Sequence, residues 1–165
     1  MYAQIIPPMD RTLAALSVIL TKAEVHCTDH KINPDTLLTF RLFPDMFAFT
    51  RQVQLACDFG ARAAARLAGA EPQSFPDTET TFAALQARIA AARAYMASFP
   101  VSAYDGAKDR DVTIKMRGQD VTMKGQAYLS SYSLPQFHFH ATTAYNILRH
   151  NGVAVGKGDY MGVTA

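Results

Sequence analysis

The stretch Leu134-Pro-Gln-Phe-His-Phe-His-Ala-Thr-Thr-Ala-Tyr-Asn-Ile-Leu-Arg-His-Asn-Gly152 decides the fold, because it is an amphipathic helix with both ends marked. Pro135 suits a first helical turn, where its missing N–H costs nothing, and Asn151-Gly152 can close the C-terminus in a left-handed conformation. At about 100° per residue, one face is apolar and comprises Phe137, Ala141, Ala144 and Leu148. The stretch also holds three of the five histidines. We therefore look for chemistry on this helix first.

Two histidines of this helix differ in their expected surroundings. His140 falls at the edge of the apolar face, so we expect it to face the core or a pocket. His150 lies in the last turn, where the helix dipole favours a cation, and we expect it to face water. Imidazole changes charge near neutral pH, so His140 could serve as an acid–base group or as a ligand. The alternative is a histidine at the edge of the core that only bonds a neighbour.

Three further segments show the apolar spacing of an amphipathic helix. They run from Tyr2 to about His26, from Phe43 to Gly69, and from a cap at Asp77 or Thr78 to Phe99. Small residues in the later half of the second segment predict that a neighbouring helix approaches it closely. Four such helices bury their apolar faces most economically against one another, so the sequence predicts an all-α four-helix bundle.

The residues between the third and fourth helices follow a different pattern. From Asp111 to Lys124 apolar and polar residues alternate, which is the period of a strand, and Arg117–Asp120 is the expected turn. We therefore expect a small β-hairpin that leans on the helices. A short helical piece is expected around Gln126–Ser131, and two glycines in the tail Val153–Ala165 argue against further helix there.

Length, composition and charge limit the class of protein. The 165 residues suit one domain, residues 1–165, and 49% apolar with 18% charged residues is a globular composition. Because the net charge is only +2 and no basic cluster is present, we expect no nucleic-acid partner. We expect the arginines of the second and third helices to lie on solvent faces; they are Arg62, Arg66, Arg88 and Arg93. The sequence lacks a signal-peptide pattern and a membrane-length apolar run, so we expect a cytoplasmic protein with no membrane partner. Cys27 and Cys57 are expected to be buried as small hydrophobes.

Several motifs resemble those of a known family. They are Arg41-Leu-Phe-Pro-Asp-Met46, Gln52, Leu134-Pro-Gln-Phe-His-Phe-His-Ala-Thr-Thr-Ala-Tyr145, Leu148-Arg-His-Asn-Gly152 and Gly156-Lys157. In these motifs the chain is similar to the bacterial family catalogued as domain of unknown function 1993, which is grouped with the DinB-like superfamily. The resemblance covers nearly the whole chain and implies a DinB-like four-helix bundle with the hairpin between its third and fourth helices. It also implies dimerisation, which is common among such bundles, and a divalent metal held by three histidines, with which some members act as thiol S-transferases.

The sequence departs from that metal pattern. Metal-binding members carry His-x-x-x-His on the last helix, whereas here Ala144 follows His140 and Thr142 follows His138 at that spacing. The inner face of the second helix offers Met46, Phe49 and Val53 and no histidine. We therefore expect the three-histidine site to be absent and the protein to have no cofactor; Zn²⁺ or Ni²⁺ in a non-standard set that includes His140 is the alternative.

Two further groups of residues could form a site. His26 and His30 lie at i, i+4, a spacing that can present two imidazoles to a metal, although we expect them on the surface without one. Asp45, Gln52 and His140 could form a small polar pocket between the second and fourth helices, with Met46 and Tyr145 beside it. Alternatively, Asp45 serves the start of its helix and Gln52 makes a helix–helix hydrogen bond.

Three functional hypotheses follow. The first is a small-ligand-binding or stress-related accessory protein without catalytic metal, with its ligand in the polar pocket. The second is a metal-dependent thiol S-transferase with an unusual ligand set. The third is a structural homodimer with no chemistry, in which exposed helix faces pair.

Overall fold

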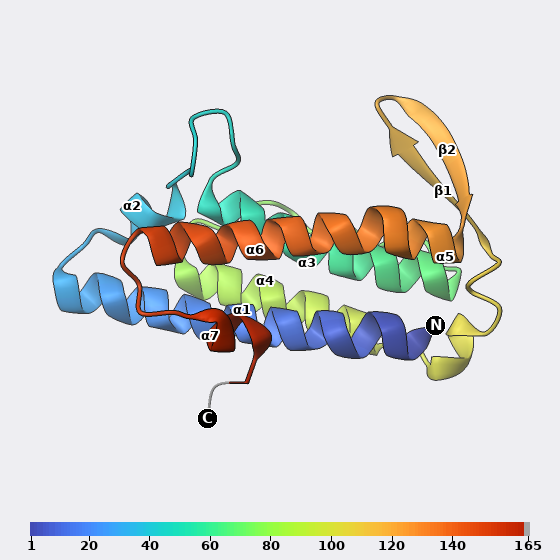
Figure 1. Ribbon diagram of the computed structural model, residues 1–165, viewed down its shortest axis with the longest axis horizontal. Coiled ribbons are helices and arrows are strands. Elements are labelled where there is room, and N and C mark those ends of the chain that lie inside the picture. The colour runs from blue at the N-terminus through green and yellow to red at the C-terminus, as the bar shows by residue number, and fades with distance from the viewer. Residues whose placement is uncertain (164–165) are drawn as a thin grey trace.

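The computed structural model describes residues 1–163 of the chain. Four long helices, α1 (Tyr2–His30), α3 (Phe49–Ala68), α4 (Phe82–Ala97) and α6 (Leu134–His150), lie side by side along the molecule (Figure 1). α3 packs against both α4 and α6, and α1 closes the other side against the same two helices. The predicted four-helix bundle is confirmed.

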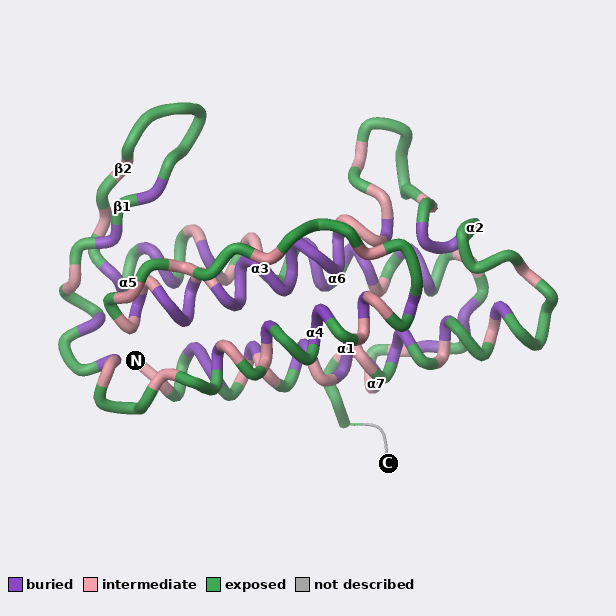
Figure 2. The backbone as a smooth tube through the Cα atoms, turned by 180° about the vertical axis from the view of Figure 1, so that it is seen from behind, coloured by how far each residue is buried: buried purple, intermediate pink, exposed green. Residues whose placement is uncertain are grey.

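The core fills the space between the four helices, where each turns its buried side inward (Figure 2). Gly60 of α3 marks a close approach of the helices, because a Cβ there would lie 3.2 Å from Sδ of Met96 and 3.4 Å from Cε2 of Phe137. The small residues of α3 therefore allow the close packing that the sequence predicted. Cys27 and Cys57 are both free and buried, as expected.

The entry to α3 differs from the prediction. Helix α1 continues to His30, the short α2 (Pro34–Leu38) follows, and α3 begins only at Phe49. The segment Leu42–Met46 is a series of turns, tied back by an Arg41 Nη1 hydrogen bond to the Met46 carbonyl oxygen at 2.5 Å. The start predicted at Phe43 was wrong, since Pro44 and Asp45 occupy a turn in place of a first helical turn.

A long connection, residues 69–81, returns along the bundle before α4 begins (Figure 2). The α4 cap is Thr81, whose side chain accepts a hydrogen bond from Ala84 N, and not Asp77 or Thr78. Asp77 instead forms an ion pair with Arg51. The connection lies against the outer side of α3, so that this helix is buried on nearly every face.

Beneath this connection Arg88 is buried, which contradicts its predicted place on a solvent face. Its guanidinium is paired with Asp58 of α3 and with Glu79, the latter at 3.1 Å, and donates to the carbonyl oxygen of Pro76 at 2.9 Å. The ring of Phe75 lies 4.9 Å from its central carbon. The charge is thus compensated on several sides, which is the condition for burying a guanidinium.

The predicted hairpin is confirmed, with a tighter turn. Strands β1 (Asp111–Met116) and β2 (Gln119–Lys124) pair antiparallel, with Met116 opposite Gln119. The turn is therefore Arg117–Gly118 alone, and both residues have positive φ (51° and 83°), as a two-residue hairpin turn requires. Val112 and Ile114 are buried, while the tip of the hairpin stands away from the bundle (Figure 1).

After the hairpin the chain is helical almost to its end. α5 (Gly125–Ala127) and a π-helical segment (Tyr128–Ser133) lead directly into α6. A further short helix, α7 (Lys157–Met161), packs on α1. The sequence analysis had predicted no helix in this tail. Asp159 explains the difference, because it accepts from the Gly156 N–H at 2.7 Å and forms an ion pair with Lys22 of α1 at 2.6 Å. Within residues 1–163 no helix has both the length and the apolar character needed to cross a membrane.

Candidate functional site

The predicted pair of Gln52 and His140 does meet between α3 and α6. Nδ1 of His140 lies 2.7 Å from Oε1 of Gln52, and Nε2 of Gln52 donates to the carbonyl oxygen of Phe47 at 3.1 Å. A carbonyl oxygen can only accept, so it fixes the amide with its nitrogen toward Phe47 and its oxygen toward the imidazole. His140 therefore carries its proton on Nδ1, and its Nε2 is a free acceptor.

His140 is neutral at physiological pH. Its exposed fraction is 7%, and burial, helped by the positive charge of Arg51, lowers the pKa of His140 to about 4. Within residues 1–163 no protein group makes a hydrogen bond to Nε2. The site thus presents an unprotonated imidazole nitrogen whose orientation is fixed by Gln52.

Aromatic rings surround this imidazole. The Phe59 ring lies parallel to it at 5.5 Å between centroids, with 8° between the planes, and the Phe139 ring meets it edge-on at 5.2 Å. Arg51 lies with its central carbon 5.9 Å from the centroid of Phe47. The site is therefore one nitrogen acceptor in an apolar, aromatic setting with one guanidinium nearby. The sequence analysis did not identify these three phenylalanines as residues of the site. A helical wheel could have indicated Phe59, because it lies two turns beyond Gln52 on the same side of α3.

The other predicted pocket residues lie elsewhere. Asp45 is exposed in the turns before α3, and Met46, half-buried, lies in the same turns. Tyr145 packs edge-on against Tyr160 of α7 at 5.8 Å, on a different side of α6 from His140. Of the five predicted residues the structure thus brings only Gln52 and His140 into contact.

Tyr160 organises a second polar cluster where α7 meets α6. The hydroxyl of Thr142 donates to Tyr160 Oη at 3.0 Å, and Tyr160 is placed to donate to Nδ1 of His138 at 3.2 Å. Burial lowers the pKa of His138. A small hollow of about 160 Å³ adjoins the cluster, between α1, α6 and α7. His138 and Tyr145 both contact Tyr160, so these two side chains hold α7 against α6.

The pair His26 and His30 lies on the surface near the end of α1. The two rings lie 4.3 Å apart, and Nδ1 of His30 is within 3.0 Å of the His26 carbonyl oxygen. A groove of about 370 Å³ runs beside them, and Val25, Asp29 and Ala154 are among its lining residues. Across residues 1–163 no three His, Cys, Asp or Glu side chains are grouped so that they could hold a metal ion.

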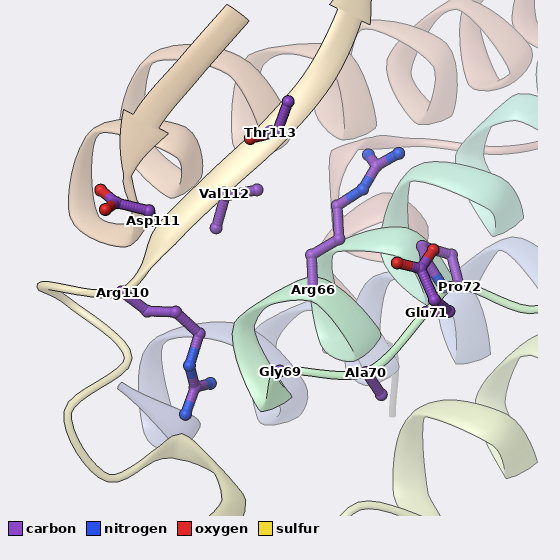
Figure 3. Close-up of a pocket in the computed structure, with 9 residues that line it drawn as sticks. All are labelled: Arg66, Gly69, Ala70, Glu71, Pro72, Arg110, Asp111, Val112 and Thr113. Carbon is purple, nitrogen blue, oxygen red and sulfur yellow. The ribbon is translucent and has the colours of Figure 1, made fainter. Parts of the chain in front are cut away.

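A larger hollow, about 440 Å³, lies between the base of the hairpin and the end of α3 (Figure 3). In Figure 3, Arg66 extends along its wall, whereas Arg110 points away from β1 toward the end of α3, where it donates to the Leu67 carbonyl oxygen. Arg110 therefore caps α3 and is not free to bind a ligand. None of the three hollows just described is lined by Gln52 or His140.

The bundle and its hairpin define the chain as a DinB-like protein. Its fold is similar to the crystal structure of a DinB family member protein from Shewanella denitrificans, with a TM-score of 0.91 and 37% sequence identity over 99% of this chain and 92% of that chain. The sequence profile of the family described as Domain of unknown function (DUF1993) matches residues 1–161, and the chain belongs to this family. A search of curated proteins found no match.

Proposed function

We propose that the protein is a small-ligand-binding accessory protein without catalytic metal, and that Nε2 of His140 accepts a hydrogen bond from its ligand. The observation that carries the proposal is the chain of hydrogen bonds from the Phe47 carbonyl oxygen through Gln52 to His140. This chain fixes the tautomer and aims the lone pair of Nε2, as preorganised binding sites do. The ligand class is a small aromatic or apolar molecule that carries one N–H or O–H donor.

The aromatic rings support this class of ligand. Phe139, which is 56% exposed, offers an aromatic surface beside the imidazole, on which the buried Phe59 ring is stacked, and a neutral histidine attracts no counter-ion. Because Arg51 is already paired with Asp77 and donates to Gln54 at 3.1 Å, it is a weak attractant for an anion. A neutral donor such as a phenol or an azole fits these groups better than a carboxylate does.

The competing proposal is a metal-dependent thiol S-transferase in which His140, with carboxylate or water ligands, holds Zn²⁺ or Ni²⁺. It would use the same free Nε2, since neutral imidazole is a common metal ligand. The side chains around His140 are aromatic rings, an amide and a guanidinium, none of which suits a divalent cation. This donor set favours the metal-free proposal.

Nuclear magnetic resonance with a library of small phenols, azoles and anilines tests the proposal. We expect hits that shift the signals of Gln52, Phe59 and His140, and that weaken at least tenfold in His140→Ala, about 1.4 kcal/mol of binding free energy. His150→Ala is the matched control, because His150 lies on the same helix and is exposed. Hits that bind elsewhere, or that bind the His140→Ala variant unchanged, would contradict the proposal.

A further inference from the structure

One edge of strand β1 has no partner strand. The two residues that flank the tight turn, Met116 and Gln119, form a hydrogen-bonded pair, and bonded pairs alternate with non-bonded ones along an antiparallel ladder. Three residues further from the turn, Thr113 and Thr122 form a non-bonded pair. Their hydroxyl oxygens lie 2.8 Å apart, which fits the closer spacing of side chains in such a pair. The N–H and C=O of Thr113 therefore point away from β2.

The backbone groups on this edge are free. Across residues 1–163 the N–H and C=O of Thr113 make no hydrogen bond, and neither do those of Asp111, which occupies the next non-bonded position of β1. Thr113 is also exposed. Unpaired N–H and C=O groups at a sheet edge form a template on which an extended segment can add as a further strand.

The free edge borders the hollow of about 440 Å³ at the base of the hairpin. Figure 3 shows β2 on one side of β1, and Arg66 and Glu71 on the other. The strand wall of the hollow comprises Asp111, Val112 and Thr113. Because so short a piece of β1 lines it, the hollow encloses a chain end better than a strand that continues past both of its ends.

The fold holds both walls of the hollow in place. On the strand side Val112 is buried, and Arg110 ties the base of β1 to the end of α3. On the other side the Tyr95 hydroxyl donates to the Glu71 carbonyl oxygen at 3.2 Å and accepts from the Gln73 N–H at 3.1 Å. A site whose walls are fixed before binding loses little conformational entropy when its ligand enters.

Arg66 supplies a cation that can bind a carboxylate. Across residues 1–163 its guanidinium takes part in no ion pair. It donates to the Tyr128 hydroxyl at 3.3 Å, and its central carbon lies 5.9 Å from the centroid of that ring. Because Tyr128 is fully buried, this contact positions the guanidinium and leaves most of its five donors for a ligand.

The acids on the walls restrict the class of ligand. Glu71 is exposed, and Asp111 forms an ion pair with Lys124 at 2.7 Å. Two carboxylates beside one available guanidinium oppose a phosphate or any other multiply charged anion. A single carboxylate at the end of a peptide suits the hollow better, because the amide groups of the peptide can also pair with the edge of β1.

We propose that the hollow binds the C-terminal end of a partner protein, which adds to the free edge of β1 as a third strand while Arg66 holds its terminal carboxylate. Hydrogen bonds between the partner's backbone and Thr113 supply affinity for any extended segment. The ion pair with Arg66 selects a chain end over an internal segment. This site is separate from His140, so the proposal stands or falls independently of the function proposed for that residue.

A tetrapeptide of alternating valine and threonine with a free C-terminal carboxylate is the probe, and the same peptide with a C-terminal amide is its control. Titration into the ¹⁵N-labelled full chain should shift the signals of Thr113 and Arg66, with a dissociation constant of about 1 mM or below. The amidated peptide should bind at least tenfold more weakly, because it lacks the charge that Arg66 binds. In Arg66→Gln the two peptides should bind about equally.

Proline substitutions test the strand edge. Thr113→Pro removes the outward N–H but leaves the bonded pairs of β1 and β2 intact, because Thr113 occupies a non-bonded position. Thr122→Pro is the matched control, since it removes an N–H from the opposite edge of the hairpin and breaks the same contact between hydroxyls. We expect Thr113→Pro to weaken binding of the acid peptide at least tenfold and Thr122→Pro to leave it within about twofold.

Each outcome decides the proposal. Absence of binding at about 10 mM acid peptide, or signal shifts confined to other surfaces, would overturn it. Equal affinities of the wild type for the acid and the amide would overturn the role of Arg66, and equal effects of the two proline variants would overturn strand addition at β1. Circular dichroism shows whether each variant is folded. Arg66→Gln alters a partly exposed side chain, so its comparison of the two peptides decides the matter even if a proline variant unfolds.

Discussion

Acid should destabilise this protein through His140 in a window set by its lowered pKa. The ordinary pKa of histidine is 6.5, and in the folded chain that of His140 is about 4. Between these values the unfolded chain binds a proton that the folded chain does not, so stability falls as pH falls. The full difference corresponds to about 3 kcal/mol, of which about 2 kcal/mol is already lost at a pH of about 5.

Urea unfolding of the wild type and of His140→Gln across this window measures the effect. Glutamine keeps a polar group near Gln52 but does not titrate, so the variant removes the contribution of His140 alone. Burial also lowers the pKa of His138, which adds acid sensitivity of the same sign to both proteins and cancels in the comparison. We expect the wild type to lose about 2 kcal/mol more than the variant between about pH 7.5 and 5. Parallel losses in the two proteins would refute the reasoning.

Three further predictions concern the frame around the site. Gly125→Ala should destabilise the fold by about 4 kcal/mol or more, because a Cβ at this position would lie 1.9 Å from the backbone oxygen of Ala107. Thermal unfolding measures this loss of stability. A near-normal melting temperature would contradict the close contact between residue 125 and Ala107. Arg88→Met should lower the free energy of unfolding by about 3 kcal/mol, because it leaves Asp58 buried without its main partner. Arg93→Met, on the same helix but partly exposed, should lower it by about 1 kcal/mol or less. Urea unfolding measures both, and equal losses would contradict a stabilising role for the buried ion pair of Arg88. Exhaustive chelation of metals should leave the melting temperature within about 1 °C of its starting value, and a larger fall would reveal a structural metal.

Local signals were sufficient to predict the bundle and its last helix. Pro135 and the left-handed Gly152 (φ 84°) frame α6 as the sequence indicated, and the small residues near Gly60 anticipated the close helix packing. The hairpin was recognisable from alternation, although not its two-residue turn. These features depend on residues close together in the chain, which is why the sequence alone contained them.

The errors came from contacts between distant segments. Arg88 lies at the edge of the apolar face of α4 on a helical wheel, but its charge favoured solvent in the sequence analysis, and Asp58 of α3 together with Glu79 and Pro76 of the returning segment supplies the partners that allow its burial. Helix α7 has one unfavourable residue, Gly158, within its five residues and is held by the ion pair of Asp159 with Lys22. Local propensity cannot report such stabilisation, because the partner lies more than a hundred residues away.

The candidate site could be predicted only in part, because it too depends on how distant segments pack together. The sequence placed His140 at the edge of its apolar face and Gln52 in a possible pocket or helix–helix hydrogen bond, and the two do meet where α3 and α6 are neighbours. Tyr145 is turned about 140° from His140 around the same helix, and Asp45 precedes the helix to which it was assigned.

The protonation of His140 tests the account most directly, since both the ligand site and the acid sensitivity depend on it. Long-range ¹⁵N–¹H correlation spectra of the untagged protein at neutral pH report which ring nitrogen carries the proton. We predict a neutral ring with its proton on Nδ1, unchanged on acidification until pH approaches about 4. A proton on Nε2, or a titration near the ordinary pKa of histidine, would contradict the account.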